Sequence, residues 1–187
     1  MFQPQVKLAF IERYCNPREG WAVFVDIDPS EEGRTGSARK TDNALVQQLA
    51  MRAEASDVRS RFEKLNVKVG GSRDQWFRHS RLPKVDGDRD IVAFQSSRKR
   101  YVIAEVEGVS SGQPEQKLYK AIGQIVLAAS AAPLGGWRRE LVLVVYGEEI
   151  TEHLKRVTAL ARLGVSALSI AENSRDDTWV LGKQLAR

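Results

Sequence analysis

The sequence is poor in the side chains that most often build cross-links and zinc sites. Its 187 residues include one cysteine, Cys15, and two histidines. A single cysteine excludes a disulfide framework within the chain and fits a reducing compartment. We find no zinc-ligand spacing, no glycine-rich phosphate loop and no serine–histidine–acid set. A small-molecule enzyme that relies on one of these chemistries is therefore the least supported class of function.

Long apolar runs are missing as well. No stretch reaches the about 20 residues that a membrane-spanning helix needs. Residues 1–20 lack the apolar core of a signal peptide. We therefore expect a cytoplasmic protein with no membrane partner. The formal net charge of +5 favours a polyanionic partner.

Apolar patterning predicts an α/β protein. Alternating or continuous apolar runs predict strands, and apolar positions three and four residues apart predict helices. The predicted strands are residues 21–27, 67–69, 88–94, 100–107, 141–146, 165–171 and 178–181. The predicted helices are residues 44–65, 114–132 and 151–163, and the predicted loops are residues 30–43 and 72–87. Since a hairpin is followed by alternating helices and strands, we expect a mixed central β-sheet flanked by helices.

The length of the chain is typical of a single domain. We expect a C-terminal helix and strands at residues 147–187 that complete the sheet. Residues 1–43 are left as an N-terminal extension. An added strand, a dimer arm and a partner-binding segment all stay open for it.

The chain is organised around a predicted β-hairpin. Its strands, residues 88–94 and 100–107, are rich in β-branched and aromatic side chains and flank a turn of four residues, 96–99. Symmetric pairing about this turn, with alternation of side chains along each strand, sorts the residues onto two faces. One face carries Ile91, Ala93, Val102, Ala104 and Val106. The other face carries Val92, Phe94, Tyr101 and Ile103, and continues into carboxylates.

Four carboxylates meet at one end of this second face. The pairing places Asp90 opposite Glu105 and Asp88 opposite Glu107. Like charges opposite each other destabilise a sheet, and some of them would have to bind protons. A hard divalent cation such as Mg²⁺ removes the conflict. The alternatives are that the charges are solvated, or that a pairing shifted by one residue separates the glutamates from the aspartates.

Further charged residues are candidates for the same site. Glu54 and Glu63 lie on the first predicted helix and could join the carboxylates as metal ligands, although a solvated helix face is the alternative. In the loop of residues 72–87, basic residues surround Trp76 and Phe77, which suits phosphate contacts and base stacking. A surface loop anchored by Trp76 would give the same pattern. The candidates for nucleic-acid contacts are Arg73, Arg78, Arg81, Lys84, Arg98, Lys99, Lys117 and Gln124.

The motifs around the hairpin resemble a known superfamily. Residues 90–94, 101–108 and 117–124 are similar to the motifs of the PD-(D/E)xK nucleases, which share the restriction-endonuclease-like fold. The core order of that fold is helix, three strands, helix and strand, which agrees with the order predicted here. The resemblance covers roughly residues 44–146, which it implies are the nuclease-like core. The resemblance implies a nuclease that acts on DNA with Mg²⁺ or Mn²⁺. It also leaves a homodimer open, because many nucleases of this fold act as dimers.

The resemblance assigns roles to individual residues. It implies that Asp90, Glu105 and the backbone carbonyl of Val106 hold the metal ion. In the family, the following helix often carries a further polar residue that faces the site. Gln116, Lys120 or Gln124 could take that place here.

Two positions depart from the family pattern. Arg89 stands in place of a proline, which is a minor change. Glu107 stands in place of a lysine that orients the attacking water and offsets negative charge. A glutamate cannot supply positive charge, but it could act as a general base or ligate a second cation. Alternatively, the cation has moved to Lys117 or Lys120, or catalysis has been lost.

Two functions follow from these patterns. The leading hypothesis is a metal-dependent nuclease in which Asp90 and Glu105 hold Mg²⁺ and Glu107 orients or deprotonates the attacking water. Lys120 or Lys117 would offset charge on the phosphate in the transition state. The runner-up is a catalytically inactive module of the same fold that binds nucleic acid or a protein partner.

Overall fold

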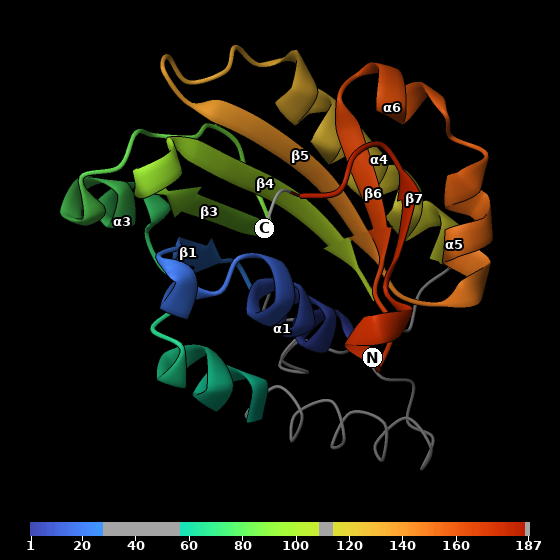
Figure 1. Ribbon diagram of the computed structural model, residues 1–187, viewed down its shortest axis with the longest axis horizontal. Helices are drawn as coiled ribbons and strands as arrows, with labels where there is room; N and C mark the ends of the chain where they lie inside the picture. Colours follow the sequence, from blue (N-terminus) through green and yellow to red (C-terminus); the bar gives the residue numbers. More distant parts are fainter. Residues whose placement is uncertain (28–56, 109–113, 186–187) are drawn as a thin grey trace, which may run out of the picture.

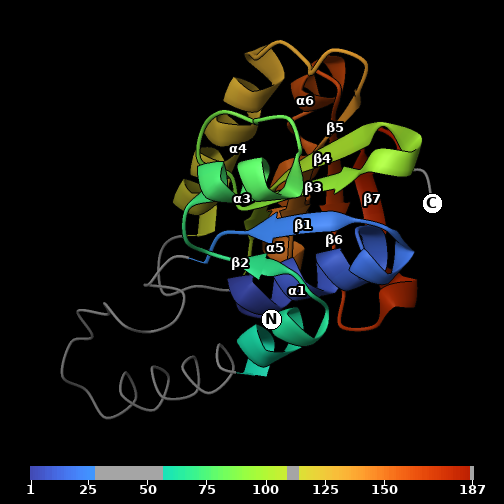
Figure 2. The same cartoon turned by 90° about the vertical axis from the view of Figure 1, so that its left-hand side faces the viewer.

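The computed structural model describes residues 1–27, 57–108 and 114–185. Within them, seven strands form one mixed sheet in the order β2-β1-β3-β4-β5-β6-β7, as Figures 1 and 2 show. The strands are β1 (Ala22–Val25), β2 (Lys68–Val69), β3 (Ile91–Gln95), β4 (Arg100–Glu107), β5 (Arg138–Val145), β6 (Val165–Ser169) and β7 (Thr178–Leu181). β3 is antiparallel to β1 and β4, whereas β5 is parallel to β4 and β6. The expected mixed sheet flanked by helices is confirmed.

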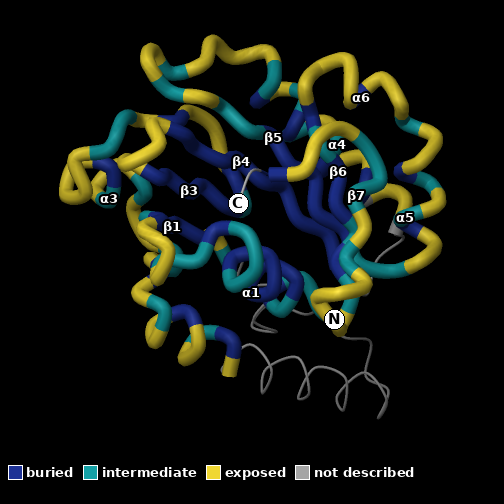
Figure 3. Tube along the Cα trace, viewed as in Figure 1, coloured by how far each residue is buried: buried dark blue, intermediate teal, exposed yellow. Residues whose placement is uncertain are grey.

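Helices cover both faces of the sheet and bury two separate apolar cores. The first face packs against α1 (Gln3–Tyr14) and the helical residues 57–64. The second face packs against α3 (Arg73–Ser80), α4 (Pro114–Ser130), α5 (Glu148–Lys155) and α6 (Ala159–Arg162). The central strands β3 and β4 are wholly buried between these layers, as Figure 3 shows, whereas the edge strands β2 and β7 are not. No helix within the described ranges combines the length and the apolar character that crossing a bilayer requires.

The first strand belongs to the central sheet and the first helix packs on one face of that sheet, so neither forms a separate extension. α1 begins with Pro4 in its first turn, and the Gln5 side chain accepts the N–H of Phe2 at 3.0 Å. Its buried side chains join the core of the first face. β1 lies between β2 and β3. The placement of residues 1–43 outside the core therefore needs correction for the described residues 1–27.

The hairpin has the predicted register. Ile91 pairs with Ala104 and Gln95 with Arg100, and the turn between the strands is a short 3₁₀ helix, Ser96–Arg98, followed by Lys99 in the left-handed conformation. The predicted division of apolar residues between the two faces is also confirmed, because each set lies in a different core. β3, however, begins at Ile91, so Asp88 lies outside the ladder and does not face Glu107.

Two other segments differ from the sequence prediction. The predicted loop at residues 72–87 contains α3, which begins because the Ser72 hydroxyl caps the backbone N–H of Gln75. The single helix predicted for residues 151–163 is instead α5 and α6. The adjacent β-branched residues Val157 and Thr158 fall between them, where helix propensity is low.

Gly108 fixes how closely α1 approaches the end of β4. A Cβ atom at this position would lie 2.6 Å from the backbone nitrogen of Gln3. We expect Gly108→Ala to lower the free energy of unfolding by about 1–3 kcal/mol, because the two backbones would have to separate.

A matched control is Gly123→Ala on α4, where a Cβ meets nothing within 4 Å. Removing glycine from that helix should raise stability by about 0.5–1 kcal/mol. Urea denaturation of both variants tests this, and equal effects would contradict it.

Candidate active site

A buried lysine lies beside Asp90. Lys7, on α1, has no exposed surface, and its Nζ atom lies 2.8 Å from Oδ1 of Asp90. The same ammonium group donates a hydrogen bond of 2.7 Å to the backbone carbonyl of Asp26, just after β1. An ammonium group can be taken out of water only where a counter-charge and hydrogen-bond acceptors replace the solvent. Asp90 and the Asp26 carbonyl supply both.

Asp90 joins three strands at their ends. Its Oδ2 atom accepts the backbone N–H of Val106 on β4 at 2.8 Å, and its backbone carbonyl accepts the N–H of Asp26 at 2.8 Å. Its side chain is 20% exposed, so solvent reaches the carboxylate from one side. The aspartate therefore fixes the geometry of this edge while one side remains accessible.

Glu105 lies next to this pair on the second face of the sheet and is only 1% exposed. Within the part of the chain that the structure describes, neither of its carboxylate oxygens accepts a hydrogen bond of normal geometry. The nearest cation is Arg89, whose Nη1 atom lies 3.6 Å from Oε1. Arg89 Nη1 also donates to the carbonyl of Gln124 on α4, at 3.2 Å. Glu105 is thus a buried acid with little direct solvation.

These surroundings shift the ionisation of Glu105. Burial raises the pKa of its carboxyl group to about 8, and the negative charge of Asp90 adds to the rise. The pKa is lowered in part by the charges of Arg89 and Lys7 and by the nearby backbone N–H of Asp90, but the effect of burial is larger. Near neutral pH, this carboxyl group therefore holds a proton unless a further cation approaches. Perturbed acids of this kind are common at functional sites.

Neighbouring elements also fix the positions of the Val106 carbonyl and of Glu107, which follow Glu105 in β4. The Val106 carbonyl accepts a hydrogen bond of 2.7 Å from the side-chain amide of Gln3, at the start of α1. Glu107 is 7% exposed, and its backbone carbonyl accepts the N–H of Tyr146 at 3.0 Å. Both residues are held between the ends of β5 and α1.

Three charged residues that the sequence predicts for the site have exposed side chains. The Asp88 side chain is fully exposed and lies 3.8 Å from Arg73, because its strand starts only at Ile91. Glu63 is exposed on the helix that packs beside α1, which fits the solvated alternative. Lys120 is exposed on α4. Glu54 and the side chain of Lys117 lie outside what the structure describes.

The predicted nucleic-acid residues lie on different elements of the structure. The turn that carries Arg98 and Lys99 lies at the opposite end of β4 from Glu105, about 20 Å away by strand rise. Lys99 instead lies over the ring of Trp137, 4.9 Å from its centroid. Among the other candidates, Arg73 lies beside Asp88 and Lys84 beside Asp74. Arg78 and Arg81 are exposed at α3, whereas Gln124 is half-buried on α4.

Sequence reasoning missed the cations of the site. Lys7 interrupts the apolar run of residues 6–11, and a lone lysine in such a run is a usable signal of a buried charge. Arg89 was noted only as a replaced proline, although it stands between two aspartates in the sequence. The four-carboxylate cluster is corrected accordingly. Asp90 and Glu105 remain together, and each has a basic side chain beside it.

The acids suit a divalent cation in part. Glu105 presents two oxygen atoms without normal hydrogen bonds, and carboxylate oxygens are the ligands that Mg²⁺ prefers. Asp90 and the Val106 carbonyl, in contrast, already have partners within the chain. Across residues 1–27, 57–108 and 114–185, no group of three or more histidine, cysteine, aspartate or glutamate side chains is arranged to hold a metal ion. A cation here would thus rest on two carboxylates and on oxygen atoms from water or substrate.

The arrangement combines two acids with two basic groups at an edge where three strands end. Such a set can bind a cation or a phosphate group and can move a proton near neutral pH, since the pKa of Glu105 is about 8. No protein-family model, no curated protein and no solved structure matches the chain. The chemistry of the site is therefore the main guide to function.

The raised pKa of Glu105 predicts a pH dependence of stability. In its folded state the carboxyl group keeps its proton up to about pH 8, whereas the ordinary pKa of a glutamate is about 4.5. The folded protein therefore binds more protons than the unfolded chain between these values, and stability falls as pH rises through this window. Each pKa unit of separation corresponds to about 1.4 kcal/mol.

We expect Glu105→Gln to remove this loss, so that the variant is more stable than the wild type at pH 8 but not at pH 4.5. Thermal denaturation with EDTA across this range measures the difference. Glu63→Gln, at an exposed glutamate, is the control and should follow the wild-type profile. A Glu105→Gln profile parallel to that of the wild type would show that Glu105 is not a buried protonated acid.

The Lys7–Asp90 pair predicts strong energetic coupling. Lys7→Met removes the ion-pair partner of the Asp90 carboxylate, whose side chain is only 20% exposed. We expect a loss of about 3 kcal/mol in the free energy of unfolding. In a double-mutant cycle with Asp90→Asn, the coupling should reach about 1–3 kcal/mol. Arg61→Met, at the more exposed pair with Glu12, should cost less than about 1 kcal/mol. Additive effects of Lys7→Met and Asp90→Asn would contradict the coupling.

Proposed function

We propose that the protein is a metal-dependent nuclease that hydrolyses phosphodiester bonds in DNA, with its centre at Asp90, Glu105 and Lys7. The observation that carries this proposal is the buried Glu105 carboxylate, which lacks normal hydrogen bonds while it lies beside Asp90 and a fully buried lysine. Unsolvated acids are costly to keep in a protein interior unless a ligand uses them. The formal net charge of +5 is compatible with a polyanionic substrate.

The topology supports a restriction-endonuclease-like fold within this proposal. α1 is followed by β1 and, after the helical residues 57–64, β2 and α3, by β3 and β4; β3 pairs antiparallel with both β1 and β4. α4 then leads to β5, which is parallel to β4. If the elements between β1 and β3 are treated as insertions, this order agrees with the helix, three strands, helix and strand of the superfamily that the motifs resemble. The first helix of that order is α1, so the candidate core begins near the N-terminus of the chain.

Asp90 and Glu105 would hold the cation, with Mg²⁺ or Mn²⁺ as the candidates. Mg²⁺ is usually bound through one or two carboxylates together with water and phosphate oxygens, so two acids are sufficient. A bound ion would polarise the scissile phosphate and lower the pKa of a coordinated water molecule. The protein contributes the rigid position of both acids, because Asp90 is fixed by the Val106 N–H and Glu105 is packed beneath α4.

Lys7 would supply the positive charge that the Glu-x-Glu motif lacks. Its ammonium group lies beside Asp90 and is held there by the Asp26 carbonyl. A fixed cation at this point can offset the negative charge that develops on the phosphate. Lys7 therefore replaces Lys120, whose side chain is exposed on α4, as our candidate for this role. Glu107, buried at the end of β4, remains the candidate that orients the attacking water.

A non-catalytic module is the second candidate, and one observation favours it. Both oxygens of Asp90 and the carbonyl of Val106 are engaged by Lys7, the Val106 N–H and Gln3. If the protein is not catalytic, the Lys7–Asp90 ion pair takes the structural place that a metal ion would have in a nuclease. The fold would then bind nucleic acid or a protein without cleaving a bond.

Cleavage assays with matched variants separate the two candidates. The wild type is incubated with single-stranded, double-stranded and branched DNA, with Mg²⁺, Mn²⁺ or EDTA. We expect metal-dependent cleavage that falls at least about a hundredfold in Asp90→Asn, which removes a metal ligand, and in Lys7→Met, which removes the positive charge beside the phosphate. Asp88→Asn removes a fully exposed acid two residues away and should retain full activity.

A metal-dependent rise in melting temperature gives a second readout, since a ligand stabilises the folded state that binds it. We expect the rise in the wild type and in Asp88→Asn, and its loss in Asp90→Asn. Absence of both cleavage and stabilisation in the wild type would overturn the nuclease proposal. Retained DNA binding in such a protein would favour the second candidate.

A further inference from the structure

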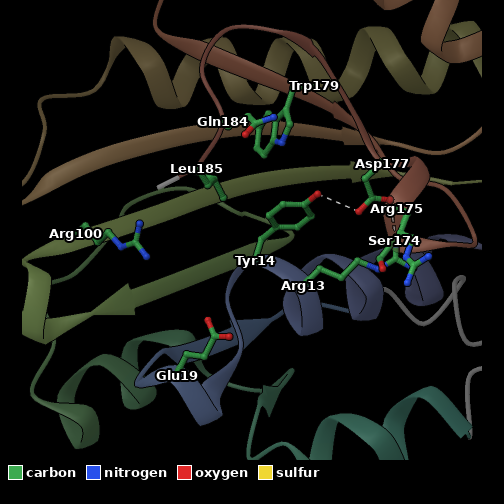
Figure 4. A pocket seen from close by; sticks show the side chains of 10 residues that line it. All are labelled: Arg13, Tyr14, Glu19, Arg100, Ser174, Arg175, Asp177, Trp179, Gln184 and Leu185. Carbon is green, nitrogen blue, oxygen red and sulfur yellow. Dashed lines mark hydrogen bonds and ion pairs between the residues drawn. The ribbon is translucent and has the colours of Figure 1, made fainter. Parts of the chain in front are cut away.

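A polar pocket of about 530 Å³ lies at the other end of α1. It opens between the end of α1, the 3₁₀ helix Ser174–Asp176, β7 and the chain that follows β7 (Figure 4). The residues that matter for its chemistry are Arg13, Tyr14, Arg100, Arg175, Trp179 and Gln184. Its volume falls in the range of small-molecule sites, about 300–1,000 Å³. Tyr14 lies seven residues beyond Lys7 on α1, about 10 Å by helix rise. The pocket is thus separate from the candidate active site.

Two aromatic rings form a fixed corner in this pocket. The rings of Tyr14 and Trp179 lie 5.6 Å apart between centroids and are almost perpendicular, at 89°. The ring of Tyr14 stacks on that of Phe10, with 5.5 Å between the centroids, and its hydroxyl donates to Asp177 at 3.0 Å. A planar ligand can stack on one ring and meet the edge of the other, which is a favourable aromatic geometry. The corner is therefore preformed for a flat ring.

The charged groups of the pocket are cationic in balance. Its lining includes three arginines, Arg13, Arg100 and Arg175, and two acids, Glu19 and Asp177. Asp177 already accepts three hydrogen bonds, from Arg13 at 2.7 Å, from Tyr14 and from the backbone N–H of Ala171. Figure 4 shows Arg100 toward one end of the pocket and Arg175 toward the other, with the aromatic corner between them. The exposed Arg175 is the cation that an anion attached to a flat ring can meet.

Arg100 supports one wall of the pocket but is not an open anion site. Its side chain is 3% exposed and lies 3.8 Å from Glu140, and its guanidinium lies 4.5 Å from the ring centroid of Trp21. Its Nε atom donates to Gln95 at 2.6 Å. Arg175 is exposed at the rim and can bind a phosphate group in the planar, bidentate manner of arginine.

We propose that this pocket binds a mononucleotide, with its base in the corner of Tyr14 and Trp179 and its phosphate on Arg175. The amide of Gln184 offers both donors and an acceptor to the edge of a base. A ring, an anion and a hydrogen-bonding edge are combined in a nucleotide, whereas inorganic phosphate or a neutral nucleoside supplies only part of this set. The proposal does not rest on the nuclease activity, because the two sites share no residue.

Titration of the full chain with AMP, GMP, CMP and UMP tests the proposal by isothermal calorimetry and by tryptophan fluorescence. We expect at least one nucleotide to bind and to alter tryptophan emission, since Trp179 lines the pocket. Arg175→Glu should weaken this binding at least tenfold. Arg162→Glu makes the same charge change at an exposed position on α6 and should leave the affinity unchanged. Melting temperatures of both variants verify that each is folded.

Three results would overturn the proposal. One is absence of binding by all four nucleotides at millimolar concentration. Another is equal affinity for inorganic phosphate or for the matching nucleoside, which would exclude recognition of base and phosphate together. The third is loss of binding in Asp90→Asn, which would place the nucleotide in the candidate active site instead. Retained binding in Asp90→Asn, with loss in Arg175→Glu, supports the pocket whether or not the protein cleaves DNA.

Discussion

The contact between Lys7 and Asp90 is the constraint on which the candidate site depends. It connects the first helix to the start of β3 across 83 positions of the sequence, and its ammonium group is wholly buried. Through Asp90 it also reaches β4, since the second carboxylate oxygen holds the N–H of Val106. One charged pair therefore sets the relation of α1, β3 and β4 at the edge where the acids gather. A buried pair of this kind gives little net stability but strongly disfavours any packing that separates its partners.

Glu105 acquires its character from that arrangement. The sheet and α4 remove it from water, Asp90 lies close by, and Arg89 is too distant for a normal hydrogen bond to its carboxylate. The resulting pKa of about 8 allows the group to exchange a proton for a cation near neutral pH. The same edge thus combines an acid that can change its ionisation with a lysine whose position is fixed. This combination is the physical basis of the proposed hydrolysis.

The sequence predicted the hairpin register because two local rules agreed. The turn at residues 96–99 and the alternation of apolar side chains both require Ile91 to face Ala104. Asp90 and Glu105 could be placed together on that basis. Lys7 could not, since no short-range pattern indicates which acid a distant lysine will meet. The mixed composition of residues 6–14 does not predict α1, in which Lys7 is as buried as its apolar neighbours. The extent of the acid cluster was overestimated at Asp88, where the strand has not yet begun.

The most direct test of the central claim is the number of protons released when a divalent cation binds. Calorimetric titration with Mn²⁺ at pH 7, in buffers of different ionisation enthalpy, measures this number. Because Glu105 holds a proton at this pH and must lose it to become a ligand, the account predicts release of about one proton per ion. Glu105→Gln should abolish that release. Cation binding at the Asp90 edge without proton release, or no cation binding at all, would contradict the assignment of Glu105 as the metal-binding acid.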